Sequence, residues 1–363
     1  MQELLNKIDE IVEKIRHAEN SRTSISEILR KMNDKIPVGP NEEIKDERLI
    51  IPFQDSNANN FSVIGVDGGI VKGSLHGLEL LLLRAIAVNF NYSSASLKDV
   101  DYYPSSNPIP TPKTSFDSFS EFELSSWYNF ERQLMEITIA IESLSKLKTE
   151  FLFLDGSVIP QYVIKPTNPI LKEKYNLLIE KYKELFDATN GKLILAGVVE
   201  DSRSVKFCDI LLRRILTDEI SRELRIVLEK TNDSNLAYHL LKKNERTFVF
   251  NYSQNPAAHP LLKEFEEVKN NFYSFYVKTA DFDRPLRVDF VAARDQDVIA
   301  NKISEVLIKT SGHAGYGLPS VLIEADQRAK LSQSDLDLFY LDLLNRIGNV
   351  SSLFRMRRDM RPF

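Results

Sequence analysis

Two aspartates stand where short apolar runs meet glycine. Asp67 lies in Phe-Ser-Val-Ile-Gly-Val-Asp-Gly-Gly, and Asp155 lies in Phe-Leu-Phe-Leu-Asp-Gly-Ser. Each apolar run predicts a buried strand, and the glycine predicts a sharp exit from the sheet directly after the carboxylate. A carboxylate at the end of a strand can point at a ligand. The pair therefore predicts a shared metal site, although phosphate-binding turns and ordinary strand exits have the same pattern.

A third carboxylate, Glu136, lies on a helix predicted over residues 121–147. Glu136 flanks the apolar stripe of this helix, on the same side as Arg132 and Ala140. Only a short turn separates the helix from the strand that delivers Asp155, so we expect Glu136 near Asp155. The alternative is that Glu136 belongs to a solvated helix face.

A fourth carboxylate, Asp326, lies on a late helix that Pro319 introduces and that extends to Lys330. Carboxylates on a first strand, the following helix, an inner strand and a last helix are arranged as in a ribonuclease H-like fold. Such oxygen ligands suit Mg²⁺ or Mn²⁺. Two of these ions about 4 Å apart can clamp a phosphodiester, which makes phosphodiester hydrolysis the predicted chemistry.

The elements that must position these residues alternate between strand and helix. Apolar and helical periodicities predict a hairpin over 61–90, an exposed proline-rich loop over 98–120, and helices and strands in alternation beyond it. The helices are predicted over 169–187, 205–228 and 296–309, and the strands over 192–199, 246–252, 272–279 and 286–292. The predicted fold class is α/β, with a ribonuclease H-like core in which helices flank a mixed central sheet.

Four segments are predicted along the chain. They are a helical N-terminal arm (1–36), a connector (37–60), the nuclease-like domain (61–335) and a C-terminal helical extension (336–363). The arm repeats apolar residues at helical spacing from Leu4 to Ile15. One alternative is that this stripe packs on the chain's own core, and the other is that it contacts a second copy or another partner.

Composition limits the setting in which this chemistry takes place. The chain has 363 residues, 43% of them hydrophobic, and a net charge of −5, which excludes a uniformly basic surface but leaves 47 Lys and Arg for a local positive track. Cys208 is the only cysteine, so no intrachain disulfide is expected and a reducing, cytoplasmic location is favoured. The first residues do not look like a signal peptide, and no membrane anchor is expected.

Four blocks of sequence, in this order, resemble the NurA family of archaeal and bacterial nucleases. They are Gly-Val-Asp-Gly-Gly at 65–69, Phe-Leu-Asp-Gly-Ser at 153–157, Gly-Val-Val-Glu-Asp-Ser-Arg-Ser at 197–204, and the run from Gly315 to Lys330. The resemblance implies a homodimeric, Mn²⁺-favouring DNA nuclease with single-strand endonuclease and 5′-to-3′ exonuclease activity. It also implies a partnership with the hexameric translocase HerA in DNA end resection, and so in double-strand-break repair and homologous recombination.

The resemblance also assigns residues. Asp67 and Asp155 match the family's metal-ligand aspartates, and Glu136 matches the helix glutamate that precedes the second aspartate. Asp326 stands where family members often have histidine, which leaves open whether nearby His313 takes part. Four cations could meet phosphate or could be ordinary surface charges: Arg203, Lys206, Arg328 and Lys330.

Two other functions fit parts of the sequence. An actin-like or sugar-kinase-like ATPase also uses Asp-x-Gly turns, but the chain has no later Gly-Gly pair and no phosphate-cradling glycine loop. A non-cleaving DNA-binding subunit of the same fold is the second rival, because the residue at Asp326 departs from the family pattern. A DNA-cleavage assay with Mn²⁺, with and without ATP, separates all three functions.

Overall fold

The structure is a computed structural model that describes residues 2–34, 43–56, 59–160, 165–216, 220–357 of the chain. It divides into two compact units, each built from separate stretches of the sequence. The first contains residues 1–57, 196–256 and 268–320, and the second contains residues 58–195, 257–267 and 321–363. In the described part of the chain, no helix is long and apolar enough to cross a membrane.

The first unit is an antiparallel sheet covered by helices. Its strands pair in the order β1-β8-β10-β11-β7, and β9 pairs with β10. The strands are β1 (Ile50–Pro52), β7 (Ile194–Val199), β8 (Glu245–Thr247), β9 (Phe250–Asn251), β10 (Phe272–Lys278) and β11 (Leu286–Val291). The helical segments are α1 (Gln2–Lys31), α4 (Lys206–Ile210), the π-helix η1 (Leu211–Ile215), α5 (Arg222–Glu229), α6 (Asp233–Leu240) and α7 (Gln296–Thr310).

Three predictions for this unit are corrected by the structure. The helix predicted over 205–228 is broken: α4 runs into η1, α5 begins only at Arg222, and residues 217–219 lie outside the described residues. The strand predicted over 246–252 is two short strands, β8 and β9. The predicted connector 37–60 contains strand β1, and its residues 37–42 and 57–58 are not described.

The two halves of helix α1 differ in burial, and each half fits one of the two alternatives for the N-terminal arm. In its second half, Ile25 and Leu29 are fully buried in the core of this unit. In its first half, the apolar side chains are exposed, among them Leu4, Ile8, Ile11 and Ile15.

The second unit is a mixed sheet with helices on both faces. Strand β2 (Phe61–Ser74) pairs antiparallel with β3 (Glu79–Ser93) along its whole length and parallel with β6 (Phe151–Asp155) along its first part. Strands β4 (Ser96–Tyr103) and β5 (Thr111–Ser115) both pair with the other edge of β3. These two strands correct the prediction of a loop over 98–120, although most of their side chains are exposed.

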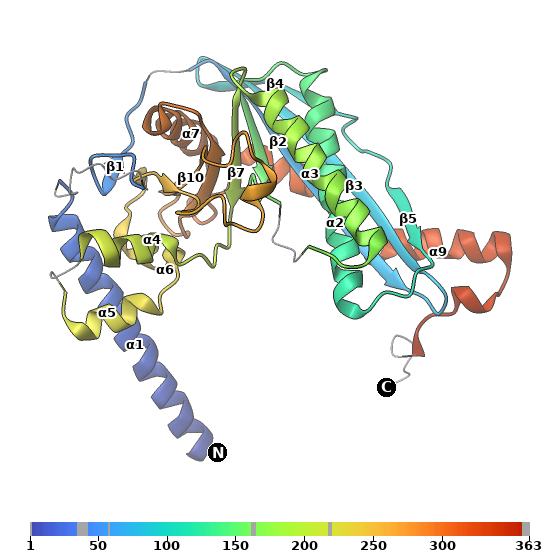
Figure 1. Ribbon diagram of the computed structural model, residues 1–363, viewed down its shortest axis with the longest axis horizontal. Helices are drawn as coiled ribbons and strands as arrows, with labels where there is room; N and C mark the ends of the chain where they lie inside the picture. Colours follow the sequence, from blue (N-terminus) through green and yellow to red (C-terminus); the bar gives the residue numbers. More distant parts are fainter. Residues whose placement is uncertain (1, 35–42, 57–58, 161–164, 217–219, 358–363) are drawn as a thin grey trace. The chain divides into compact units, whose positions relative to one another are not determined.

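The helices of the second unit follow the predicted pattern. They are α2 (Glu121–Leu144), α3 (Pro169–Thr189), the short η2 (Leu262–Glu264), α8 (Ser320–Ala329), α9 (Gln333–Ile347) and η3 (Ser351–Leu353). Figure 1 shows α2 and α3 side by side along one face of the β2–β3 hairpin, and α2 packs directly on both strands. Helices α8 and α9 contact β2 from the opposite face, because Gly69 and Gly73 face them while Gly68 faces α2.

Candidate functional site

Asp67 and Asp155 lie on neighbouring parallel strands at the same level of the sheet. The pairing of β2 with β6 ends at Val66 opposite Leu154, so each aspartate is the next residue on its strand. Burial raises the pKa of Asp67 from its usual value, although hydrogen bonds with the backbone of Gly68 and with the Asp155 side chain oppose this shift. Asp155 is exposed at the strand end.

The structure corrects one detail of the predicted strand endings. Strand β6 does end at Asp155, and Gly156 follows with φ of 100°, which is a left-handed conformation that suits glycine. Strand β2, however, does not end at Asp67 but continues through the glycines to Ser74. The glycine pair after Asp67 is therefore not an exit turn.

The two glycines instead allow helices to approach the strand closely from both faces. A Cβ added at Gly68 would lie 2.5 Å from Cγ of Glu136 on α2, and a Cβ at Gly69 would lie 2.0 Å from the carbonyl oxygen of Ala329 on α8. No other residue type leaves this space. The Asp-Gly-Gly sequence thus lets α2 and α8 pack closely on the two faces of β2 directly beside Asp67.

Glu136, like Asp67, is largely shielded from solvent. It forms an ion pair with Arg132 one turn earlier on α2 and packs on Gly68. Burial raises the pKa of Glu136 to about 8, and although Arg132 opposes this shift, the negative charges of Asp67 and Asp155 add to it. The influence of both aspartates indicates that Glu136 lies near them.

Asp326 approaches the site from the opposite face. It lies exposed on α8, and its negative charge raises the pKa of Asp67. All four predicted carboxylates thus belong to the second unit. Asp326 and Asp155 affect the pKa of Asp67, and Asp67 and Asp155 raise the pKa of Glu136. His313 belongs to the first unit, where its Nδ1 accepts a hydrogen bond of 3.1 Å from the backbone N–H of Gly315.

The donor set suits a hard divalent cation. Oxygen ligands of this kind bind Mg²⁺ or Mn²⁺, and the raised pKa values of Asp67 and Glu136 express repulsion and desolvation that a nearby cation would relieve. In the side-chain positions of the described residues, however, no three His, Cys, Asp or Glu side chains converge closely enough to hold one ion. A hard cation held by one or two of these carboxylates would complete its coordination with water.

The four predicted phosphate-binding cations differ in their surroundings. Arg328 pairs with Glu324, donates to the carbonyl of Ser106 and lies over the ring of Tyr102, while Lys330 is exposed close to the same helix. Arg203 is exposed in the first unit.

The ammonium group of Lys206 already has partners within the first unit. Its Nζ donates to the carbonyl of Tyr252 and lies over the ring of that residue, and burial lowers its pKa to about 8. This makes it a poorer candidate for phosphate contact than Arg203.

The sequence reasoning did not assign a role to Arg132. In the described part of the chain, the positive charge of its guanidinium lowers the pKa of both Glu136 and Asp67. The signal was present, since Arg132 and Glu136 are four residues apart, the spacing of an intrahelical ion pair. Sequence alone could not show that this pair is buried.

Comparison with known proteins agrees with this geometry. Residues 61–331 match the family model of the NurA domain, which is more than half of the chain. No curated protein matches the chain.

Solved structures are similar over nearly the whole chain. The NurA nuclease from Sulfolobus solfataricus has 15% sequence identity and a TM-score of 0.60, with 100% of this chain and 99% of that chain covered. Two further NurA structures, one of them bound to dAMP and manganese, have 11% identity, TM-scores of 0.55 and 0.54, and coverage of 97% of this chain and 99% of theirs. At these identities the structures show a shared fold. The family match shows more: the chain belongs to the NurA family, a family of nucleases.

Proposed function

We propose that this chain is a divalent-metal-dependent deoxyribonuclease that hydrolyses phosphodiester bonds at the site formed by Asp67, Glu136, Asp155 and Asp326. The observation that carries the proposal is the register of β2 and β6, which makes Asp67 and Asp155 neighbours on adjacent strands of a NurA-family chain. A NurA structure bound to dAMP and manganese supports both the nucleotide chemistry and Mn²⁺ as the ion, with Mg²⁺ as an alternative.

In this proposal the exposed carboxylates of Asp155 and Asp326 and the buried carboxylate of Asp67 bind the metal. Asp67 and Asp155 hold the ion or ions between them, and Asp326 adds a ligand from the opposite face. When bound, one or two such ions supply Lewis-acid activation of water and stabilisation of the leaving oxygen. Arg132 pairs with Glu136 and opposes the rise in its pKa that burial causes, and the neighbouring helices α2 and α8 pack closely on β2 beside the site.

The finer activities follow from the family resemblance. We propose single-strand endonuclease and 5′-to-3′ exonuclease activity in a homodimer that works with a HerA-type hexameric ATPase in DNA end resection and double-strand-break repair in the cytoplasm. The exposed cations Arg203, Arg328 and Lys330 are candidates for DNA contact. The exposed first half of α1 supplies an apolar surface for dimerisation or for docking of the translocase.

One assay separates this proposal from its rivals. Purified protein is incubated with fluorescently labelled single-stranded and double-stranded DNA, with Mn²⁺, with and without ATP, and products are resolved on a sequencing gel. We expect DNA cleavage that requires Mn²⁺ and not ATP. ATP hydrolysis without cleavage would instead favour the kinase-like ATPase, and DNA binding without either reaction would favour a non-cleaving subunit.

A further inference from the structure

The second half of β2 extends beyond its parallel partner. Pairing with β6 ends at Val66, whereas β2 continues to Ser74, and among the described residues no strand pairs with that edge of β2 after Val66. Asp67 is the first residue of this unpaired edge. The unpaired edge of β2 therefore begins beside the candidate metal ligands.

Helices flank this edge on both faces of the sheet. On one face, α2 runs beside β2, with Glu136 against Gly68 and Tyr128 beside Lys72. On the other face, Ala329 packs against Gly69 and Leu336 packs against Gly73, so α8 and α9 follow the strand in turn. The unpaired edge of β2 is thus flanked by α2 on one face of the sheet and by α8 and then α9 on the other.

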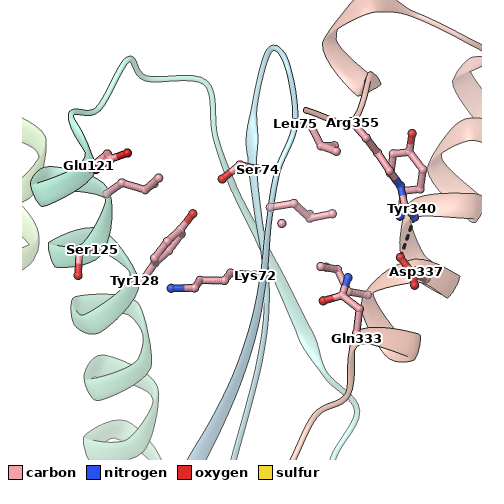
Figure 2. Close-up of a pocket in the computed structure, with 14 residues that line it drawn as sticks. Lys72, Ser74, Leu75, Glu121, Ser125, Tyr128, Gln333, Asp337, Tyr340 and Arg355 are labelled. Atoms are coloured by element: carbon pink, nitrogen blue, oxygen red, sulfur yellow. Dashed lines mark hydrogen bonds and ion pairs between the residues drawn. The ribbon is translucent and has the colours of Figure 1, made fainter. Parts of the chain in front are cut away.

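At the end of β2 farthest from Asp67 lies a pocket of about 580 Å³. Figure 2 shows its three sides: Ser125 and Tyr128 from α2, Lys72 and Ser74 from β2, and Gln333 and Tyr340 from α9. Lys72 is five residues from Asp67, which is about 17 Å along an extended strand. The size is within the usual range for a pocket that holds a small organic ligand.

Two basic side chains lie over tyrosine rings on opposite walls of this pocket. The Lys72 ammonium lies 4.8 Å from the centre of the Tyr128 ring, and the Arg355 guanidinium lies 4.8 Å from the centre of the Tyr340 ring. Tyr128 is itself held by a hydrogen bond of 2.8 Å to Glu79. In the described part of the chain, Lys72 has no carboxylate partner.

Lys72 and Arg355 remain available to bind a ligand although carboxylates also line the pocket. Arg355 pairs with Asp337 at 2.7 Å, but both side chains are about 40% exposed, and solvent-exposed pairs of this kind are weak. Glu121 also lines the pocket, from the first turn of α2. The remaining lining supplies hydroxyl, phenol and amide groups, together with four leucines and a glycine. Among these are the groups that a nucleotide needs: cations for its phosphate and neutral polar groups for its sugar and base edges.

The wall that carries Arg355 lies outside the part of the chain that matches the family. The family match ends at residue 331, whereas Gln333, Tyr340 and Arg355 come after it. This C-terminal segment is fixed to the hairpin turn by backbone hydrogen bonds, from His76 N–H to the Phe354 carbonyl at 2.8 Å and from Gly77 N–H to the Ser352 carbonyl at 3.1 Å. The C-terminal extension therefore adds a wall to the pocket.

We propose that this pocket binds a nucleotide of the substrate strand at a distance from the nucleotide that is cut. The strand follows the unpaired edge of β2 from the metal ligands, and Lys72 and Arg355, on opposite walls of the pocket, each hold one of its phosphates. This inference rests on the proposed nuclease function and adds a subsite that the C-terminal extension completes.

The test measures binding of a fluorescein-labelled single-stranded 15-mer by anisotropy over a range of salt concentrations, in an Asp155→Asn background that prevents cleavage. The pocket variant carries Lys72→Ala and Arg355→Ala. Its matched control carries Lys98→Ala and Arg346→Ala, which remove the same charges from exposed positions on β4 and α9 of the same unit, one of them also from an ion pair with aspartate. A third variant with Lys72→Arg and Arg355→Lys retains the charges.

We expect the pocket variant to raise Kd at least fivefold and to lower the slope of log K against log salt by about 1.4, or about 0.7 for each lost phosphate contact. The control and the charge-retaining variant should remain close to the parent.

Equal Kd values and slopes for the pocket variant and its control would overturn the subsite. That outcome differs from failure of the proposed function, which would appear as absence of Mn²⁺-dependent cleavage by the unmodified chain. Circular dichroism and thermal melting establish that each variant is folded.

Discussion

At the scale of single residues, the site depends on carboxylates whose charges oppose one another. Asp67 and Glu136 are both buried, and both have raised pKa values because burial disfavours their charged forms and neighbouring carboxylates repel them. Arg132 offsets part of this repulsion. A group of this kind is poorly stable in its fully charged form without a cation, which is the expected condition of a metal site before its metal binds.

Glu136 gives a testable dependence of stability on pH. Its pKa is about 8 in the folded chain and near 4.5 when unfolded, so the folded state binds this proton more tightly. Its contribution to stability is therefore complete below about pH 4.5 and is lost as pH rises through about 8. In metal-free buffer, the melting temperature of the unmodified chain should fall relative to that of Glu136→Gln between pH 5 and 8.5, by at least about 3 °C.

Differential scanning calorimetry with chelator checks this expectation. Glu142→Gln, at an exposed position on the same helix, is the matched control and should parallel the unmodified chain. A constant difference between Glu136→Gln and the unmodified chain over this pH range would contradict the burial of a titrating carboxyl.

Gly69 gives a second prediction at this scale. Because an added methyl would lie 2.0 Å from the backbone carbonyl of Ala329, Gly69→Ala has to push α8 away from β2. We expect a loss of about 1–3 kcal/mol in the free energy of unfolding and weaker Mn²⁺ binding, since Asp326 moves with α8. Gly312→Ala, at a position where the added methyl meets open space, should change neither quantity in urea unfolding and calorimetric titration.

Retained stability in Gly69→Ala would show that α8 is not held against β2 at this point. Retained Mn²⁺ affinity with lost stability would instead show that Asp326 does not contribute to binding.

At the scale of elements, the sequence predicted what depends on local pattern. The apolar runs around Asp67 and Asp155 were strong enough to place both strands, and their similar endings predicted a shared site. Helix α2 was predicted nearly to its ends because its apolar residues recur at helical spacing, and the structure adds a Ser120 cap at its start.

Features that depend on contacts between distant segments were not predictable. Strands β4 and β5 are mostly exposed and contain or adjoin prolines, so their residues had a loop composition, and only pairing with β3 makes them strands. The role of Gly68 and Gly69 required knowledge that helices approach both faces. The burial of the Arg132–Glu136 pair was hidden for the same reason.

Helix α1 carries the prediction at this scale. Deleting residues 1–16 removes the exposed apolar residues but leaves Ile25 and Leu29 in their core, so the chain should remain folded. We expect the shortened chain to lose dimerisation or binding to a HerA-type hexamer, measured by light scattering after size exclusion and by co-purification. Glu10→Ala with Lys14→Ala, which alters only exposed polar positions of the same segment, should retain both. A shortened chain that still dimerises and still binds the hexamer would rule out this role for the arm.

At the scale of the whole molecule, the chain belongs to the NurA family and matches NurA structures over nearly its full length. The four carboxylates all lie in one of its two compact units. The same unit contains the pocket at the end of β2, including the side that the C-terminal residues form. The proposed chemistry and the proposed strand-binding path are thus properties of a single unit. The other unit contains α1 and the exposed Arg203, which are candidates for assembly and DNA contact.

The central claim is that Asp67 and Asp155 together support metal-dependent DNA cleavage. Its most direct test is the rate of Mn²⁺-dependent cleavage of a labelled single-stranded oligonucleotide by Asp67→Asn and Asp155→Asn. Asp99→Asn, at an exposed position on β4, is the control. We predict a loss of at least about a hundredfold in both site variants, with folding retained, and an unchanged rate in the control. Cleavage at the unmodified rate by both site variants, in preparations free of other nucleases, would contradict the account.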